Sequence, residues 1–211
     1  MADEAIEDLL LHLPAVAQSA TGVAASDAQA APWLRSLAPS VASSTRLFCF
    51  PGIGRGSSIY EHSPPSLMGE HAEVCTIELP GRGLRAHVVP LGRVDEIVSQ
   101  VAPALRYRLD LPFAFFGIDV GAILMFETTR RLRAEDAPVP DHFFVAAAMA
   151  PQTCYLAPMH YPPRQQLLRA LHNLDFVVDE SLVGERALRA DVAAVSSYVF
   201  VQDPEVGDGN I

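Results

Sequence analysis

The stretch from Phe115 to Ala122 constrains the fold of this chain more than any other part of the sequence. The apolar run from Leu111 to Phe116 predicts a short buried strand, and residues 122–133 predict a helix. Between them lies a Gly-x-Asp-x-Gly turn with Asp119 at its centre. A turn this tight holds its central residue in a strained backbone conformation, with the side chain above the sheet. Asp119 is therefore the first candidate for a functional residue.

Apolar runs alternate with helical patterns along the rest of the chain. The expected strands cover 46–50, 73–79, 111–116 and 142–149. The expected helices cover about 59–69, 94–109, 122–133, 165–178 and 187–201, the last being either a helix throughout or a helix that continues into a strand. Strands that are apolar throughout predict an α/β fold, in which a mostly parallel sheet carries helices on both faces. Ligands of such sheets bind beyond the carboxyl ends of the strands. The Gly-rich loop after Phe50, the turn after Leu79 and Asp119 all lie at that edge.

The 211 residues fit one main domain with a short N-terminal extension. Residues 1–32 predict a short amphipathic helix and a linker rich in Ala and Ser. This helix either docks a partner, ends an upstream domain or is a frayed terminal helix. We expect residues 33–211 to form the α/β domain, with a lid at about 152–185. The alternative for the helix within that lid is an ordinary packing helix.

Composition excludes several classes of function. The formal net charge is −10, and all 15 basic residues are Arg, which argues against nucleic acid as a partner. No apolar run approaches the roughly 20 residues that span a bilayer, so we expect no membrane-spanning segment. The three cysteines lack CxxC spacing, which indicates reduced thiols and a cytoplasmic location, with an organellar one left open. The scattered His residues predict no metal site, and we expect no cofactor.

Several separate motifs resemble those of the type II thioesterases, the α/β-hydrolases that edit polyketide and nonribosomal peptide synthesis. The resemblance runs from residue 33 to about 201. It is carried by Trp33–Arg35, Leu47–Pro51 with Gly54, Leu79–Gly83 with Arg85, Pro112–Gly117, and Leu188–Asp191 with Tyr198. We take Asp191 to be structural, in a helix or loop contact. The Gly-x-Asp-x-Gly turn then corresponds to the family's nucleophile elbow.

The resemblance implies an enzyme that releases acyl groups from the phosphopantetheine thiol of a carrier protein. The family uses a Ser–Asp–His triad, in which Ser attacks the thioester, His takes its proton and Asp orients the His. Two backbone N–H groups hold the oxyanion, and by position these belong to Ile53 and Val120. The implied partners are an acyl carrier protein or a larger multi-subunit assembly.

The chain departs from the family pattern around the elbow. Asp119 stands where the family has Ser, and Arg55 replaces a small residue in the oxyanion loop. The remaining triad positions and the last strands of the sheet are expected to be missing. His160, at the start of the expected lid, is a candidate replacement base. Arg55 either neutralises Asp119 across the former oxyanion site or points to solvent.

Two classes of function follow from these departures. In the favoured one, the chain is a degenerate thioesterase that acts as a binding or structural subunit, with a partner covering its exposed sheet edge. In the alternative, it is an active hydrolase or acyltransferase that uses Asp119 as nucleophile or base.

Overall fold

The structure is a computed structural model that describes residues 32–37, 43–61, 72–154, 162–174, 176, 178 and 183–202. The helix and linker predicted at the N-terminus lie outside this part of the chain, apart from residue 32. His160 and much of the predicted lid also lie outside it. The predictions for those segments therefore stay predictions.

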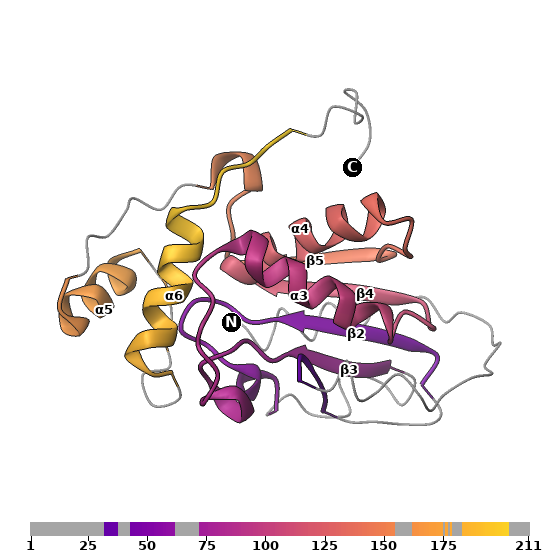
Figure 1. Cartoon of the computed structure of the whole chain (residues 1–211), viewed down its shortest axis with the longest axis horizontal. Coiled ribbons are helices and arrows are strands. Elements are labelled where there is room, and N and C mark those ends of the chain that lie inside the picture. The colour runs from indigo at the N-terminus through magenta and orange to yellow at the C-terminus, as the bar shows by residue number, and fades with distance from the viewer. Residues whose placement is uncertain are drawn as a thin grey trace.

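A five-stranded sheet forms the centre of the described structure (Figure 1). Its strand order is β1-β3-β2-β4-β5. The neighbouring strands are parallel except for β1 and β3, which are antiparallel. The bounds are β1 Leu34–Ser36, β2 Thr45–Phe50, β3 Ala72–Ile77, β4 Phe113–Ile118 and β5 His142–Ala146. The predicted α/β class and mostly parallel sheet are confirmed, whereas β1 was not predicted.

The helix predicted at about 59–69 is described only over 59–61, where the chain forms the end of a 3-10 turn. The other four predicted helices are present, although those predicted at 165–178 and 187–201 each end five residues early. They are α3 Val94–Arg106, α4 Val120–Ala134, α5 Arg164–Asn173 and α6 Glu185–Ser196, with short 3-10 turns η1 Ser57–Tyr60, η3 Gly83–Arg85 and η4 Pro151–Thr153. Figure 1 shows α3 and α4 side by side against the sheet, with α5 and α6 beyond the end of β2 that carries its arrowhead. The carboxyl ends of the parallel strands β2, β3, β4 and β5 therefore face α6.

The sheet separates two buried apolar clusters. On one face the rings of Phe48, Phe50 and Phe115 pack edge to face, at centroid distances of 5.9 and 5.1 Å, beneath α3 and α4. On the other face Tyr60 of η1 packs against Phe116 at 6.0 Å. Both faces of the central strands are thus covered, which is why the buried positions of β2 and β4 are apolar except for Arg46 near the start of β2.

The strand β5 differs from its prediction. The apolar run 142–149 predicted a covered strand, but β5 ends at Ala146 and lies at the edge of the described sheet. Phe143 is 41% exposed and Val145 is 57% exposed. Hydropathy alone does not separate a central strand from an edge strand, because it carries no information about which strands pair.

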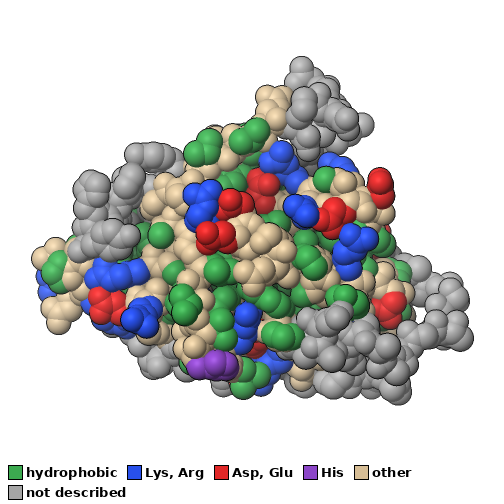
Figure 2. All heavy atoms as spheres, in the orientation of Figure 1, with side chains coloured by type: hydrophobic (Ala, Val, Ile, Leu, Met, Phe, Trp, Pro, Cys, Tyr) green, Lys and Arg blue, Asp and Glu red, His purple; other side chains and the backbone are tan. Residues whose placement is uncertain are grey.

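Charged side chains are interspersed on the face that carries α3 and α4. Figure 2 shows Arg and acidic side chains next to one another there, without a basic patch among the residues drawn in colour. Several of them form surface ion pairs, such as Arg106 with Glu135 at 2.8 Å. Exposed pairs of this kind contribute little to stability. The prediction that the protein does not bind nucleic acid is left untested by this view.

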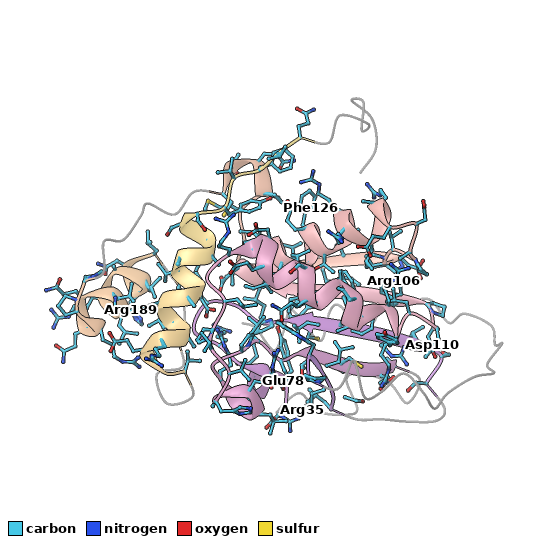
Figure 3. All side chains as sticks on the ribbon, in the orientation of Figure 1. Arg35, Glu78, Arg106, Asp110, Phe126 and Arg189 are labelled. Carbon is cyan, nitrogen blue, oxygen red and sulfur yellow. The ribbon has the colours of Figure 1, made fainter. Side chains whose placement is uncertain are left out.

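A buried ionic network holds the amino ends of the strands. Arg46 donates to Glu73 at 2.8 Å and to Asp110 at 2.7 Å, and Arg108 also donates to Glu73. Burial opposes ionisation of Glu73, but the hydrogen bonds and charge of Arg46 outweigh it and hold the pKa of Glu73 below its usual value. Figure 3 shows Asp110 at the end of the molecule opposite Arg189 of α6. This network therefore lies away from the carboxyl edge.

Two glycines bring α4 into contact with the sheet. A Cβ on Gly121 would lie 2.3 Å from the carbonyl oxygen of Phe50, and one on Gly117 would lie 2.7 Å from the backbone N of Ala122. Both distances are shorter than any stable contact, so α4 approaches β2 and β4 backbone to backbone.

We expect Gly121→Ala to destabilise the protein by about 1–3 kcal/mol, because the methyl group forces α4 away from β2. Urea unfolding of the purified protein measures this difference. Gly92→Ala is the matched control, since a Cβ there would make an ordinary contact of 3.6 Å with Ala193. The control is expected to change stability by less than about 0.5 kcal/mol. Equal effects of the two substitutions would contradict the close approach at Gly121.

Candidate functional site

Asp119 lies in the sharp turn between β4 and α4. Its backbone has φ 51° and ψ −118°, a conformation that residues other than Gly rarely adopt. The N–H of Asp119 donates to the carbonyl of Ala146 at 3.2 Å, and its own carbonyl accepts from Ala122 at 3.1 Å. These bonds, together with the packing of α4, maintain a strained turn of the kind that is concentrated at functional sites. The predicted strain at the elbow is confirmed.

The carboxylate of Asp119 lies against the loop that follows β2. A Cβ built on Gly52 would be 2.4 Å from Oδ2 of Asp119 and 3.2 Å from its Cγ. Only a residue without a side chain leaves room for the carboxylate at this point. The carboxylate therefore occupies the space between the elbow and the loop.

Burial changes the acidity of Asp119. The side chain belongs to a residue that is 8% exposed, and this burial raises its pKa to about 6, against the opposing charge of Arg55. Tyr60 shares this surrounding, because burial raises its pKa, the charge of Asp119 adds to the increase and that of Arg55 reduces it. The hydroxyl of Tyr60 donates to the carbonyl of Phe50 at 3.1 Å. Asp119, Arg55 and Tyr60 thus influence one another electrostatically at the carboxyl edge.

The loop after β2 also carries the residues predicted to form an oxyanion site. Ile53 is fully buried in this loop, and Val120 is the first residue of α4, directly after Asp119. The N–H of Arg55 donates to the carbonyl of Gly52 at 3.2 Å and closes the loop as a tight turn around Ile53. The structure therefore places Ile53 and Val120 in the two segments that border the carboxylate. Oxyanion binding by their N–H groups stays a prediction.

The positive charge of Arg55 lowers the pKa of the Asp119 carboxyl group. This is the direction expected if the two side chains form the predicted ion pair. The pairing itself stays a prediction. His160 lies outside the described residues, so the structure does not place it relative to Asp119.

The sequence did not predict the partner of Asp191. Arg82 donates two hydrogen bonds to this carboxylate, from Nη1 to Oδ2 at 2.8 Å and from Nη2 to Oδ1 at 2.6 Å. Oδ2 also accepts from the N–H of Gly54 at 2.9 Å. The structural role predicted for Asp191 is confirmed. Arg82 and Asp191 each lie in a motif that carried the family resemblance, but 109 positions separate them, and spacing along the chain does not show that they meet.

Other kinds of site are not evident in the described part of the chain. Among those residues, no group of three or more His, Cys, Asp or Glu side chains is placed to hold a metal ion. In the same part of the chain, none of the helices has the length and apolar character that a membrane crossing requires. Cys49, Cys75 and Cys154 form no disulfide.

Comparison with known proteins identifies related chains. A family model described as "Thioesterase domain" matches residues 45–204. The gramicidin S biosynthesis protein GrsT of Aneurinibacillus migulanus is 36% identical over 172 residues, which cover 77% of this chain and 66% of GrsT. A probable cadicidin biosynthesis thioesterase of Streptomyces griseus is 29% identical over 89% of this chain and 53% of its own length. The chain thus spans less than two thirds of the length of both relatives.

Solved structures agree with these matches. The type II thioesterase BorB from the borrelidin biosynthetic cluster superimposes with a TM-score of 0.72 at 30% identity, over 82% of this chain and 73% of BorB. RedJ, in a structure with a polyethylene glycol molecule bound in its active site, gives a TM-score of 0.68 at 32% identity, over 77% of this chain and 69% of RedJ. The family-model match over residues 45–204 includes strands β2 to β5 and the candidate site around Asp119.

We expect Asp119→Asn to become more stable than wild type as the pH rises. The folded pKa of about 6 lies above the unfolded value of about 3.9, so the native state holds its proton more strongly than the unfolded chain. Ionisation therefore costs wild type stability between about pH 4 and 6.5. The advantage of Asp119→Asn should grow by on the order of 2 kcal/mol between pH 4 and 7.5, as measured by urea unfolding.

Asp141→Asn serves as the control for this measurement, because Asp141 is exposed. Substitution at this exposed position is expected to change the free energy of unfolding by less than about 0.5 kcal/mol. If Asp119→Asn and wild type lose stability in parallel as the pH rises, the carboxylate is not buried as the structure shows.

Proposed function

The chain belongs to the thioesterase domain family, with type II thioesterases among its relatives, and we propose that it is a binding subunit for carrier-linked acyl groups. Its place would be in an assembly that makes nonribosomal peptides or polyketides. In support, one relative is a gramicidin S biosynthesis protein and another is a type II thioesterase from the borrelidin biosynthetic cluster. The acyl group would reach the site on the phosphopantetheine arm of a carrier protein. The reduced thiols of Cys49, Cys75 and Cys154 suit a reducing compartment such as the cytoplasm.

The position of the Asp119 carboxylate carries this proposal. In a serine thioesterase the nucleophile adds to the carbonyl carbon, and negative charge develops on the carbonyl oxygen next to the oxyanion donors. Here Oδ2 of Asp119 lies against Gly52, between the elbow and the loop that contains Ile53. A carboxylate in that space repels a developing oxyanion, and the repulsion is strong where burial lowers the dielectric constant. Asp119 is therefore poorly placed to form a covalent acyl intermediate of the serine type.

The surroundings of Asp119 nevertheless support the binding of a polar group. The carboxyl group of Asp119 lies among the elbow, the Gly52 loop and Tyr60. It accepts hydrogen bonds when it is ionised and donates one when it is protonated. The pKa of about 6 makes both forms accessible near neutral pH. An amide or hydroxyl of a phosphopantetheine arm, or the thioester carbonyl itself, would have the chemistry to bond to this group.

A second function is favoured by the raised pKa of Asp119. A buried carboxylate with a pKa of about 6 is in the range of general bases at neutral pH. In that case Asp119 takes a proton from a water molecule while the oxygen of that water attacks the thioester carbonyl carbon. The tetrahedral intermediate then collapses, the carbon–sulfur bond breaks, and the departing thiolate takes the proton back from Asp119. The products are a carboxylic acid and a free thiol.

Thiol release from an octanoyl-pantetheine thioester tests the two functions. For a binding subunit we expect no release above the uncatalysed rate by wild type or by Asp119→Ala. Release by wild type that is lost in Asp119→Ala would instead establish the general-base hydrolase. The rate would then rise with pH through about 6, because only the ionised carboxylate accepts a proton.

Binding is measured separately, by calorimetric titration of wild type with an octanoyl carrier protein and with the same carrier bearing a free thiol. We expect the acylated carrier to bind about tenfold more tightly, a difference of roughly 1.4 kcal/mol. Asp119→Asn retains a hydrogen-bonding side chain and is the matched variant for Asp119→Ala. Equal affinity for the two carriers, together with an absence of turnover, would contradict acyl binding at this site.

A further inference from the structure

A buried ion pair connects three segments at the carboxyl edge. Asp191 lies in α6 and Arg82 lies in the turn after β3, and each residue is 3% exposed. The two parallel hydrogen bonds between them measure 2.8 and 2.6 Å, the bidentate geometry that fixes an Arg–carboxylate pair in orientation. The third segment is the loop after β2, which both residues contact through its backbone.

The contacts with that loop are specific. The N–H of Gly54 donates to Oδ2 of Asp191 at 2.9 Å, while Nη1 of Arg82 donates to the carbonyl of Arg55 at 2.9 Å. The Arg82–Asp191 pair therefore bonds to the backbone N–H of one loop residue, Gly54, and to the carbonyl of the next, Arg55. Because Arg55 closes the turn onto Gly52 by a backbone hydrogen bond of 3.2 Å, the tether continues to the residue against which Asp119 lies.

Side-chain packing joins α6 to the same loop. Gly54 has φ 63°, and a Cβ there would lie 3.0 Å from Cδ1 of Leu188, one turn before Asp191 in α6. Gly81, next to Arg82, likewise leaves room for Ala187, at 3.2 Å from its would-be Cβ. A movement of α6 would therefore disturb both the ion pair and the backbone of the loop.

We propose that Arg82 and Asp191 are positioning residues, whose ion pair holds the loop after β2 closed over Asp119. Through this pair, the closed position of the loop depends on the position of α6. The two residues act through the loop and do not touch the carboxylate in this arrangement. A ligand or partner that shifts α6 would thereby open the surroundings of Asp119. The proposal holds whether Asp119 binds an acyl group or activates water.

Electrostatics make this coupling measurable. Burial is the larger influence on the pKa of Asp119, and the charge of Arg55 in the loop opposes it. The charge of Asp119 in turn raises the pKa of Tyr60 in η1. Loosening the loop admits water to the carboxylate, which favours its ionised form. A change at Arg82 or Asp191 should therefore be visible at Asp119, although neither residue is its neighbour in the chain.

The test follows the Asp119 carboxyl carbon by NMR through a pH titration of wild type, Asp191→Asn and Arg82→Gln. The signal is assigned by its loss in Asp119→Asn. We expect the pKa of Asp119 to fall by at least about half a unit in both variants, because both loosen the loop. Arg82→Lys keeps the positive charge but loses the two-pronged contact, and the same direction of shift is expected for it.

A direct effect of charge gives a different pattern. Asp191→Asn leaves the cation of Arg82 uncompensated and would lower the pKa of Asp119, whereas Arg82→Gln leaves an anion and would raise it. Shifts of opposite sign in these two variants, or no shift in either, would overturn the proposal. Glu73→Gln is the control, since it breaks a buried ion pair at the other end of the sheet and is expected to lower stability without moving the Asp119 titration.

Native-state hydrogen exchange in wild type tests the same link without a substitution. We expect the N–H of Gly54 and the amides of α6 to share one opening free energy as denaturant is added below the unfolding transition. Exchange of Gly54 while the α6 amides stay protected, or the reverse, would overturn the coupling. This measurement decides the matter even where a variant at Arg82 or Asp191 fails to fold.

Discussion

The backbone contact between α4 and β2 determines the rest of the site. Gly121 lets the helix lie directly on the carbonyl of Phe50, and Gly117 lets β4 pass beneath the start of the helix. With both elements fixed this closely, the single residue between Ile118 and Val120 has to turn the chain in one step. Its positive φ follows from that geometry and not from any preference of aspartate. The strain at Asp119 is thus sustained by packing energy that is spread over the sheet and α4.

The same turn has different consequences for a carboxylate and for a hydroxyl group. A serine in this position would be neutral and would carry a single oxygen, so the space beside Gly52 would stay open. The carboxyl group of Asp119 fills that space and brings in a charge that burial makes unfavourable, which its pKa of about 6 reflects. The elbow therefore keeps its geometry, while the ionised form of Asp119 places a negative charge beside the predicted oxyanion site. For this reason, membership of the thioesterase family does not by itself assign the serine-type reaction to this chain.

Local sequence patterns predicted the elements of the fold well, because each pattern reflects contacts within that element. The strand, two glycines and helix around Asp119 lie within a few positions of one another, so their arrangement could be predicted from their spacing in the sequence. The three-residue strand β1 was missed, because its pairing with β3 is a tertiary contact and its sequence has no strand pattern of its own. The exposure of Val145 was missed for the same reason, since edge position depends on which strands are neighbours.

Long-range polar contacts were beyond sequence reasoning, and the Arg82–Asp191 pair is the clearest case. A buried ion pair is weak support for stability, because desolvation of both charges offsets most of their attraction. An apolar pair of similar size would hold α6 on the loop without fixing the orientation of Gly54 and Arg55. The guanidinium of Arg82 instead donates to the loop backbone and the carboxylate of Asp191 accepts from it, which an apolar pair cannot do. The pair is therefore better explained by the orientation it imposes on the loop than by its contribution to the free energy of folding.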